Sequence, residues 1–325
     1  TANCLLNFGE DGGATGWMVG QPGQGLRQMF QMMNEARIGV GLGAAALGCR
    51  SYQLSLQYAR ERCQGRPIGV RDGSPVPLIA HADVRRMLLA QKAYAEGALA
   101  LCLYCARLVD LEDTDPESAA LLGLLTPVAK TWASEYGLAA NDIAIQIHGG
   151  YGYTRDFDVE QLWRDNRLNP IHEGTTGIQA IDLVGRKILR EGSAVPLLES
   201  AILGSVDAAG QDEILADHAV ALRQGWDQIS RAMDGLKSLG SAEACNNATS
   251  FLRALGHVVV AWLWLDQALA ARKLSGAGEN RRYYVEGKVL ACRYIFESEL
   301  PIVDAWLSPV RSNSEAATSI SEDAF

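Results

Sequence analysis

The sequence predicts a mainly α-helical protein organised around an antiparallel four-helix bundle. Three observations lead to this fold class. Long segments repeat apolar residues at the spacing of an α-helix, the connections between them are short, and strand-like runs occur only before about residue 23. Long helices joined by short connections pack antiparallel, because each helix must turn back along its predecessor.

Four helices are expected to form the bundle. The first lies within residues 24–62, where apolar residues recur at helical spacing and many small residues allow a neighbouring helix to approach. The segment GRPIGVRDGSPVP ends it. The second runs from about 80 to 110 and the third from about 117 to 147, with the turn LEDTDPES between them. The fourth follows IHEGTT and continues to about 190.

A second helical unit is expected beyond the break EGSAVP. Helical patterns continue from about 196 to 308, with polar breaks near residues 209, 240 and 276. The tail SNSEAATSISEDAF has little to bury. The predicted divisions are a β-domain remnant (1–23), the helical bundle (24–190), an additional helical domain (191–310) and a flexible tail (311–325).

The start of the chain does not read as the start of a domain. It opens TANCLLNFGE, without a methionine and without a helix start, and its strand-like runs CLLNF and GWMVG are separated by glycines. Two such runs are too few to form a sheet that stands alone. We therefore expect residues 1–23 to be the end of a β domain whose larger part precedes this chain.

Composition and charge exclude several classes of protein. The 325 residues are 48% hydrophobic and 21% charged, which is typical of a globular protein with a sizeable core. The net charge of −9, with arginines scattered along the chain, argues against a nucleic-acid or anionic-membrane surface. HVVVAWLWLDQALAA is too short for a membrane span and ends in charge. With no targeting signal visible, we expect a bacterial-type cytoplasmic protein.

The seven cysteines are expected to be reduced and intracellular. Cys102 and Cys105 form a CxxC pair, but they lie in the continuous apolar helix LALCLYCARLV, with no second pair and no nearby histidine. Buried thiols therefore explain the spacing better than a redox or metal site. No metal centre is predicted.

Three segments could carry chemistry, although each is weak when taken alone. The arginines of ARERCQGRPIG could grip a phosphate, since guanidinium matches phosphate geometry, or could equally be a solvated helix end. The glycines of QIHGGYGYTRD could let a flat ligand reach the backbone, but glycine after a helix is more often its C-terminal stop. Glu173 precedes the N-cap candidates Thr175 and Thr176, so its carboxylate could pair with helix amides or act as a base.

The order and spacing of these segments resemble the C-terminal helical domain of the acyl-CoA dehydrogenase family across residues 24–190. The matching signatures are MMNEARIGVG, ARERCQGRPIG, QIHGGYGYTRD and IHEGTTGIQ. The lead-in GWMVGQPGQGL is similar to the end of that family's β domain. The extension from about 191 to 308, ending ACRYIFESELPIVDAW, resembles a longer subfamily that includes the 3-methylmercaptopropionyl-CoA dehydrogenases.

This resemblance implies FAD-dependent α,β-dehydrogenation of an acyl-CoA thioester to the trans-2-enoyl-CoA. Glu173 matches the catalytic base that takes the α-proton, while the β-hydrogen leaves as hydride to the flavin N5. Such a proton is very weakly acidic, so the enzyme must stabilise the developing enolate and desolvate the base until its pKa rises. Gly174 is then expected to leave room for the thioester or the flavin ring.

The resemblance also implies the residues that hold FAD and substrate. Residues matching family contacts to FAD, some of them across a subunit interface, are Arg62, His81, Gln146, Gly149, Gly150, Thr175 and Gly177. Asn34 and Arg37 match the region that contacts the CoA part of the substrate. Gly174 is the third residue expected to contact the substrate.

The sequence departs from the family pattern at several positions. Cys63 to Pro67 lacks the usual phenylalanine before its glycine, and Ala82 stands where relatives often have a glutamine near FAD, which leaves His81 as the candidate there. Relatives that place the base on the first helix have it directly before the arginine matching Arg37, where this chain has Ala36. Glu173 therefore keeps the role.

The implied partners are an acyl-CoA substrate, an electron-transfer flavoprotein as acceptor, and a second copy of the chain, with a homodimer favoured over a tetramer. The chain alone is expected to be inactive. Two alternatives remain open at this point: an acyl-CoA oxidase, and a non-catalytic FAD-binding member of the family.

Overall fold

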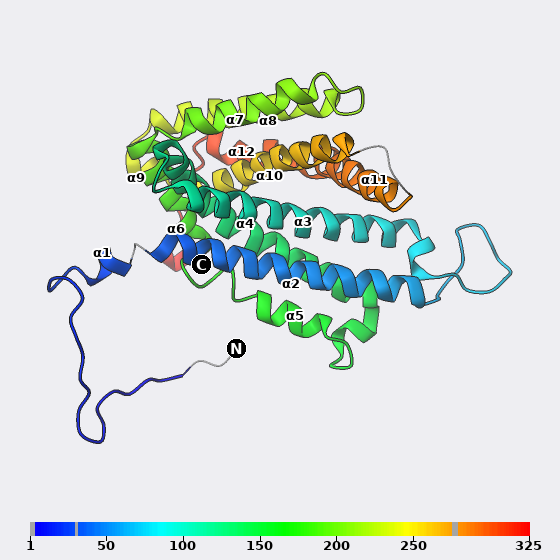
Figure 1. The fold of residues 1–325 in the computed structure, drawn as a ribbon, viewed down its shortest axis with the longest axis horizontal. Coiled ribbons are helices and arrows are strands. Elements are labelled where there is room, and N and C mark those ends of the chain that lie inside the picture. The colour runs from blue at the N-terminus through cyan, green and yellow to red at the C-terminus, as the bar shows by residue number, and fades with distance from the viewer. Residues whose placement is uncertain (1–3, 30–31, 275–278) are drawn as a thin grey trace.

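The protein is mainly helical, as the sequence predicts (Figure 1). The computed structural model describes residues 4–29, 32–274 and 279–325. Three long helices lie side by side: α2 (Met33–Glu61), α3 (Ala82–Leu111) and α4 (Pro116–His148). The bounds of α3 and α4 were predicted within two residues, whereas α2 begins nine residues after the start of the predicted segment 24–62. The connection between α3 and α4 is the predicted acidic turn. Asp115 caps α4 by accepting hydrogen bonds from the amides of Glu117 and Ser118.

Helices α2 and α4 approach closely because small residues meet where they cross. A methyl group added at Gly137 would lie 2.5 Å from the carbonyl oxygen of Ala44. One added at Gly48 would lie 3.2 Å from the Cα atom of Gly137. Asn141 then ties the same pair of helices, since its Nδ2 donates to the Oγ of Ser51 over 2.6 Å. The small residues noted in the sequence therefore set the tight spacing of the bundle.

The fourth helix of the bundle has two parts. α6 (Thr176–Ile181) continues directly into a π-helix, η4 (Asp182–Glu191), in which each hydrogen bond spans one residue more than in an α-helix. Gly192, with a φ of 62°, ends it at the predicted break. The sequence predicted neither the π-helix nor α5 (Val159–Asn166), a short helix that packs against α2 and α4.

The remaining helices form the C-terminal part of the molecule, above the bundle in Figure 1. They are α7 (Val195–Ala209), α8 (Ala216–Lys237), α9 (Ser241–Ala244), α10 (Ala248–Lys273), α11 (Glu279–Tyr294), the π-helix η5 (Ile295–Glu299) and α12 (Ile302–Arg311). Breaks follow at the predicted positions near 209 and 240, whereas the one predicted near 276 lies outside the described residues.

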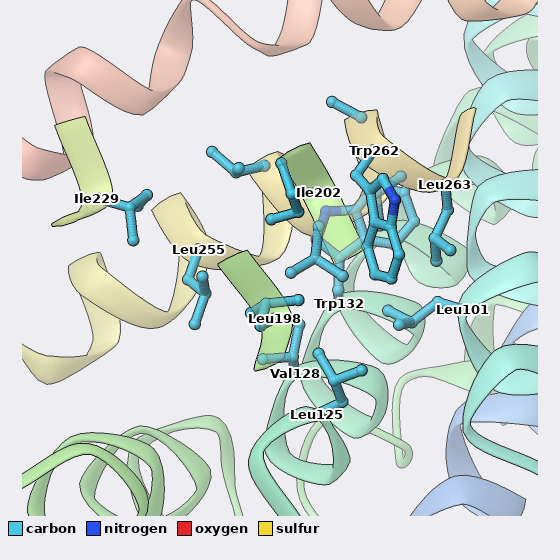
Figure 2. Close-up of a cluster of buried hydrophobic side chains, with 14 of the residues drawn as sticks. Leu101, Leu125, Val128, Trp132, Leu198, Ile202, Ile229, Leu255, Trp262 and Leu263 are labelled. Atoms are coloured by element: carbon cyan, nitrogen blue, oxygen red, sulfur yellow. The ribbon is translucent and has the colours of Figure 1, made fainter. Parts of the chain in front are cut away.

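One hydrophobic core joins the bundle to the C-terminal helices (Figure 2). Val128 and Trp132 of α4 face Leu198 of α7 and Leu255 of α10 in this cluster. The helices before and after the break near residue 191 therefore share one hydrophobic core. The division of the chain into two domains at that point stays a prediction.

A buried carboxylate strengthens the same junction. Glu299 of η5 accepts a hydrogen bond from the hydroxyl of Tyr94 on α3 over 2.6 Å and one from Tyr294 over 3.2 Å. The Nε2 of His257 on α10 lies 3.4 Å from the other oxygen of Glu299. Burying a carboxylate is costly unless hydrogen bonds satisfy it, so these contacts fix η5 against the bundle.

Helix α10 contains the apolar run HVVVAWLWLDQALAA and begins before it. By length and composition it could cross a membrane, and it is the one such helix within the described ranges. The sequence-based expectation counted only the uninterrupted run HVVVAWLWLDQALAA, whereas the helix begins earlier, at Ala248. In the fold, 83% of its most apolar window is buried, so α10 serves as the central helix of the C-terminal core.

The N-terminal segment has no strand among its described residues, 4–29. Figure 1 shows it extending away from the bundle, and it ends in the one-turn helix α1 (Gly25–Met29). Its large apolar side chains are exposed, with Trp17 at 85% and Phe8 at 81%. The strand-like pattern of this segment therefore has no sheet to join within the described chain, as expected for two isolated runs.

Candidate functional site

The residues predicted to form the site divide between the two ends of the bundle. The Glu173 end consists of Asn34, Arg37, Glu173, Gly174, Thr175 and Gly177. The Arg62 end consists of Arg62, His81, Gln146, Gly149 and Gly150. Because Arg37 and Arg62 lie near opposite ends of α2, and an α-helix rises 1.5 Å per residue, the two ends are about 37 Å apart. The structure therefore does not bring the whole set into one place within a single chain.

Glu173 lies on the short loop before α6, in an unusual backbone conformation. Its φ is 55°, a left-handed value that non-glycine residues rarely adopt. The carbonyl oxygen of Glu173 accepts a hydrogen bond from the Nε2 of Gln179 over 3.0 Å. The next carbonyl, that of Gly174, accepts one from the Nζ of Lys130 over 2.8 Å. The Glu173 side chain itself is exposed, and hence available to a ligand at this surface.

Gly174 is required by the loop itself. Its φ is 92°, and a methyl group at this position would lie 2.7 Å from the Nε2 of Gln179. A side chain here would therefore be strained and would displace the glutamine. The sequence suggested only that a ligand needs this space, whereas the structure shows a local reason for glycine that needs no ligand.

Thr175 caps α6, as one of the two candidates was predicted to do. Its Oγ1 accepts a hydrogen bond from the amide of Ile178 over 3.4 Å. Thr176 takes a different role, since its hydroxyl donates to Glu135 of α4 over 3.1 Å. Arg253 of α10 donates two hydrogen bonds to the same carboxylate, each 3.1 Å long. The carboxylate of Glu135 therefore links α10 to the start of α6.

A cavity of about 680 Å³ lies beside this start of α6. Thr175, Thr176 and Gly177 line one side of it, and Tyr136 of α4 and Trp306 of α12 line another. The cavity therefore combines hydroxyl groups with aromatic rings, a lining suited to a flat ligand that carries polar groups. Two of the residues predicted to touch FAD, Thr175 and Gly177, face it.

Arg37 is buried against η4, with 5% of the residue exposed. Its Nη1 donates to Asp182 over 3.0 Å, and Arg186 donates to the same carboxylate over 2.9 Å. Burial would raise the pKa of Asp182, but its bonds to Arg186 and Arg37 outweigh burial and hold that pKa below its ordinary value. This pairing could not be predicted, because Asp182 lies 145 positions from Arg37 along the chain.

A second cavity, of about 660 Å³, opens beside this ion cluster. Arg37, Arg186 and Arg190 line it together with the exposed apolar side chains of Ile178 and Ile181. The Nε of Arg37 is buried without a hydrogen-bond partner in the structure. This lining of cations and apolar groups suits an anionic ligand with an apolar part. Asn34, predicted to contact CoA, lies one helical turn before Arg37 on the same helix.

The Arg62 end is more open. Arg62 is the C-cap residue of α2, and its guanidinium lies 5.7 Å from the ring centre of Tyr151. Gln146, Gly149 and Gly150 are exposed at the end of α4. Gly149, with a φ of 62°, stops α4, as the capping interpretation predicts, whereas a methyl group at Gly150 would meet nothing within 4 Å. The end of α4 thus leaves its backbone open to a ligand at Gly150.

His81 has a structural partner. One nitrogen of its ring lies 2.8 Å from the carbonyl oxygen of Gln64, and the ring packs beside Gly65. This contact fastens the loop that joins α2 to α3, where Cys63 and Pro77 also form an isolated β-bridge. A role of His81 in cofactor binding stays a prediction.

Sequence reasoning missed three residues at the Glu173 end, namely Lys130, Glu135 and Gln179. Lys130 did give a signal, because it stands inside the apolar segment LLTPVAKTW, where a charged residue is unusual. Among the described residues, no group of three or more histidine, cysteine, aspartate or glutamate side chains is arranged to hold a metal ion.

Comparison with known proteins shows which family this fold belongs to. Residues 23–189 match the family described as acyl-CoA dehydrogenase, C-terminal domain, and residues 200–321 match the one described as acetyl-CoA dehydrogenase C-terminal like. The chain belongs to the acyl-CoA dehydrogenase family, as its motifs indicated.

Individual relatives are similar over most of the chain. It is 36% identical to 3-methylmercaptopropionyl-CoA dehydrogenase of Ruegeria pomeroyi over 82% of this chain and 47% of that protein. It is 32% identical to the broad-specificity linear acyl-CoA dehydrogenase FadE5 of Mycobacterium tuberculosis, over 100% of this chain and 57% of that protein. The chain therefore spans about half the length of the curated relatives it matches.

Solved structures share the fold at lower identity. The structure of Caenorhabditis elegans ACDH-11 in complex with C11-CoA superposes with a TM-score of 0.73 at 20% identity, over 93% of this chain and 49% of that one. An acyl-CoA dehydrogenase of Bacillus anthracis complexed with FAD gives a TM-score of 0.71 at 20% identity, over 90% and 51%. The similarity includes the C-terminal helices as well as the bundle.

Proposed function

We propose that this protein is an FAD-dependent acyl-CoA dehydrogenase and that Glu173 is its catalytic base. The observation that carries the proposal is the placement of Glu173. An exposed carboxylate stands on a loop whose two consecutive carbonyls are held by buried side chains, and a cavity lies beside the start of the helix that follows. A base needs a fixed position and an open approach, and this loop supplies both.

Glu173 would remove the α-proton of the acyl-CoA thioester. The α-carbon–hydrogen bond breaks, and its proton moves to a carboxylate oxygen of Glu173. When bound, FAD supplies the acceptor for the hydride that leaves the β-carbon, which yields the trans-2-enoyl-CoA. The buried arginine of the second cavity, Arg37, and its neighbour Asn34 would hold the CoA part of the substrate at the same end of the bundle.

The residues present fit FAD at both ends of the bundle. At the Arg62 end an exposed guanidinium suits a phosphate, and Gly150 leaves the backbone accessible. At the Glu173 end Thr175 and Gly177 face a cavity with aromatic walls. The separation of about 37 Å exceeds the length of a flavin dinucleotide. Each FAD would therefore contact the Glu173 end of one subunit and the Arg62 end of another, which favours a homodimer.

An absorption experiment tests the proposed function. The flavin band of the intact protein is recorded anaerobically before and after addition of each member of a small acyl-CoA panel, for the wild type and for Glu173→Gln. We expect one substrate to bleach the wild-type flavin, and the variant to bind that substrate while bleaching at least about 100-fold more slowly. Equal bleaching by the variant would contradict the role of Glu173.

Two further outcomes separate the alternatives. Bound flavin that no acyl-CoA bleaches would favour a non-catalytic FAD-binding protein. Rapid reoxidation of the bleached flavin in air would favour an oxidase, whereas slow reoxidation in air and fast reoxidation by electron-transfer flavoprotein would support the dehydrogenase.

A further inference from the structure

Lys130 is a fully buried lysine at the Glu173 end. It lies on α4 with 0% of the residue exposed, and its Nζ donates to the carbonyl oxygen of Gly174 over 2.8 Å. Lysine is almost never fully buried unless a partner compensates for the loss of water. The carbonyl of Gly174, the residue after Glu173, is the hydrogen-bond partner that compensates Lys130. The proposed chemistry does not otherwise use the lysine.

Gln179 holds the preceding carbonyl from another direction. It is also 0% exposed, it lies on α6, and its Nε2 donates to the carbonyl oxygen of Glu173 over 3.0 Å. Two buried side chains from two helices therefore hold two consecutive carbonyl groups. The Gly174 carbonyl also accepts a longer bond, of 3.5 Å, from the same Nε2 of Gln179. The backbone of Gly174 lies between the two carbonyls, and the left-handed backbone of Glu173 comes directly before them, a conformation that persists only where the surroundings impose it.

Three charged groups, from α2, α4 and the loop, influence the charge of Lys130. Burial lowers the pKa of Lys130 to about 8, and Arg37 on α2 acts in the same direction. Glu135, one turn along α4, and Glu173 on the loop oppose this by favouring the charged lysine. The lysine and the proposed base therefore interact through their charges as well as through the peptide between them.

We propose that Lys130 and Gln179 are positioning residues, which fix the carbonyl groups of Glu173 and Gly174 and so direct the Glu173 carboxylate toward the substrate. The inference rests on the proposed role of Glu173 as the base. Gly174 belongs to the same arrangement, because any larger residue there would displace the amide of Gln179. Neither Lys130 nor Gln179 needs to touch the substrate to act in this way.

Two measurements on the intact, flavin-loaded protein test this inference. Lys130→Met removes one hydrogen bond to the loop and Gln179→Met removes two, while each keeps an unbranched side chain of similar length. Thr126→Val is the matched control, since it removes a buried hydrogen bond on α4, to the carbonyl of Leu122, that does not involve the loop. The first measurement is hydrogen exchange of the amides of residues 178 and 179, which donate to the Oγ1 and the carbonyl oxygen of Thr175 at the end of the loop. The second is the rate of anaerobic flavin reduction at saturating acyl-CoA, measured together with substrate affinity.

We expect both methionine variants to speed exchange at residues 178 and 179 by about 10-fold or more, and to slow flavin reduction by a similar factor with little change in substrate affinity. Thr126→Val is expected to change neither property. Wild-type reduction should also slow above pH 8 as Lys130 loses its proton, and Lys130→Met should lack that step. Exchange in both methionine variants equal to that of Thr126→Val would overturn the inference.

The two readouts separate this inference from the proposed function. If no acyl-CoA reduces the wild-type flavin, the proposed function fails, while faster exchange in both methionine variants would still support the hold on the loop. If the wild type is reduced and the variants are reduced equally fast, the proposed function stands and the positioning role is wrong. A Lys130→Met protein that does not fold leaves the Gln179→Met result to decide.

Discussion

The two ends of the bundle differ in how their polar residues are held. At the Glu173 end, side chains from α2, α4 and α10 form hydrogen bonds that fix η4, the loop and the start of α6. At the Arg62 end, Arg62 lies over a partly exposed aromatic ring, and Gln146 and Gly150 face outward. Hydrogen bonds within the chain hold the polar groups of the Glu173 end, whereas the polar groups of the Arg62 end are open to a ligand or to another subunit.

This difference indicates a division of labour. A base must be fixed relative to its substrate within a fraction of an ångström, which requires rigid internal support. A phosphate-binding arginine on an exposed helix end needs no such support, because ligand binding itself can fix its position. The chain therefore contributes a rigid, internally supported half to one proposed flavin site and an open, exposed half to another.

The largest expected effect is a loss of stability that distinguishes Gly152 from Gly150, two glycines at the Arg62 end. Gly152→Ala would place a methyl group 2.6 Å from the carbonyl oxygen of Ile145, so we expect it to lower the free energy of unfolding by about 3 kcal/mol. Gly150→Ala, with nothing within 4 Å, should leave stability unchanged and weaken FAD binding. Denaturant titration with FAD titration checks both. Equal stability loss in the two variants would show that Gly150 serves the fold.

The next effect concerns the cation at the same end. Arg62→Ala should weaken FAD binding roughly tenfold, because a charge-assisted hydrogen bond to phosphate is lost. Arg60→Ala, an exposed arginine on the same helix end, is the matched control and should bind FAD as the wild type does. Calorimetric titration of the FAD-free protein measures this. Equal losses would mean that overall charge, rather than Arg62, attracts the cofactor.

A further effect concerns pH and the Glu173 end. The pKa of Lys130 is about 8 in the folded protein and near 10.5 when unfolded, so the folded state binds fewer protons between these values. Stability is therefore expected to rise with pH from about 8 to 10.5, by at most about 1.4 kcal/mol per pH unit from this group. Subtracting the profile of Lys130→Met isolates the contribution. A flat difference would contradict the burial effect.

Much of the bundle could be predicted from the sequence, because it depends on local signals. Apolar periodicity gave α2, α3 and α4, Asp115 and Pro116 mark the start of α4, and Gly192 marks the end of η4. The π-helix escaped prediction because its buried apolar residues, Leu183, Val184 and Ile188, follow a spacing that an ordinary α-helix also satisfies. α5 was missed because its eight residues follow a glycine-rich turn and carry few apolar side chains.

The site could be predicted only in part. Glu173 and Arg62 belong to short motifs, so the family resemblance reached them directly. The partners of the loop did not, because Lys130 contacts Gly174 from 44 positions away and Arg37 contacts Asp182 from 145 positions away. Such pairings depend on how helices pack, which periodicity does not specify. The separation of the two ends along α2 likewise becomes visible only in the folded chain.

Mixed oligomers test the central claim, that the two ends of one chain serve two different flavin sites. Glu173→Gln and Arg62→Ala chains, carrying different tags, are produced separately and together. Flavin reduction by acyl-CoA is measured for each sample at an FAD concentration that fills wild-type sites but leaves Arg62→Ala sites largely empty. A mixed dimer has one site with both wild-type residues, so the coexpressed sample should recover about a quarter of wild-type activity. Activity no higher than the average of the two separate variants would show that both residues act within a single chain.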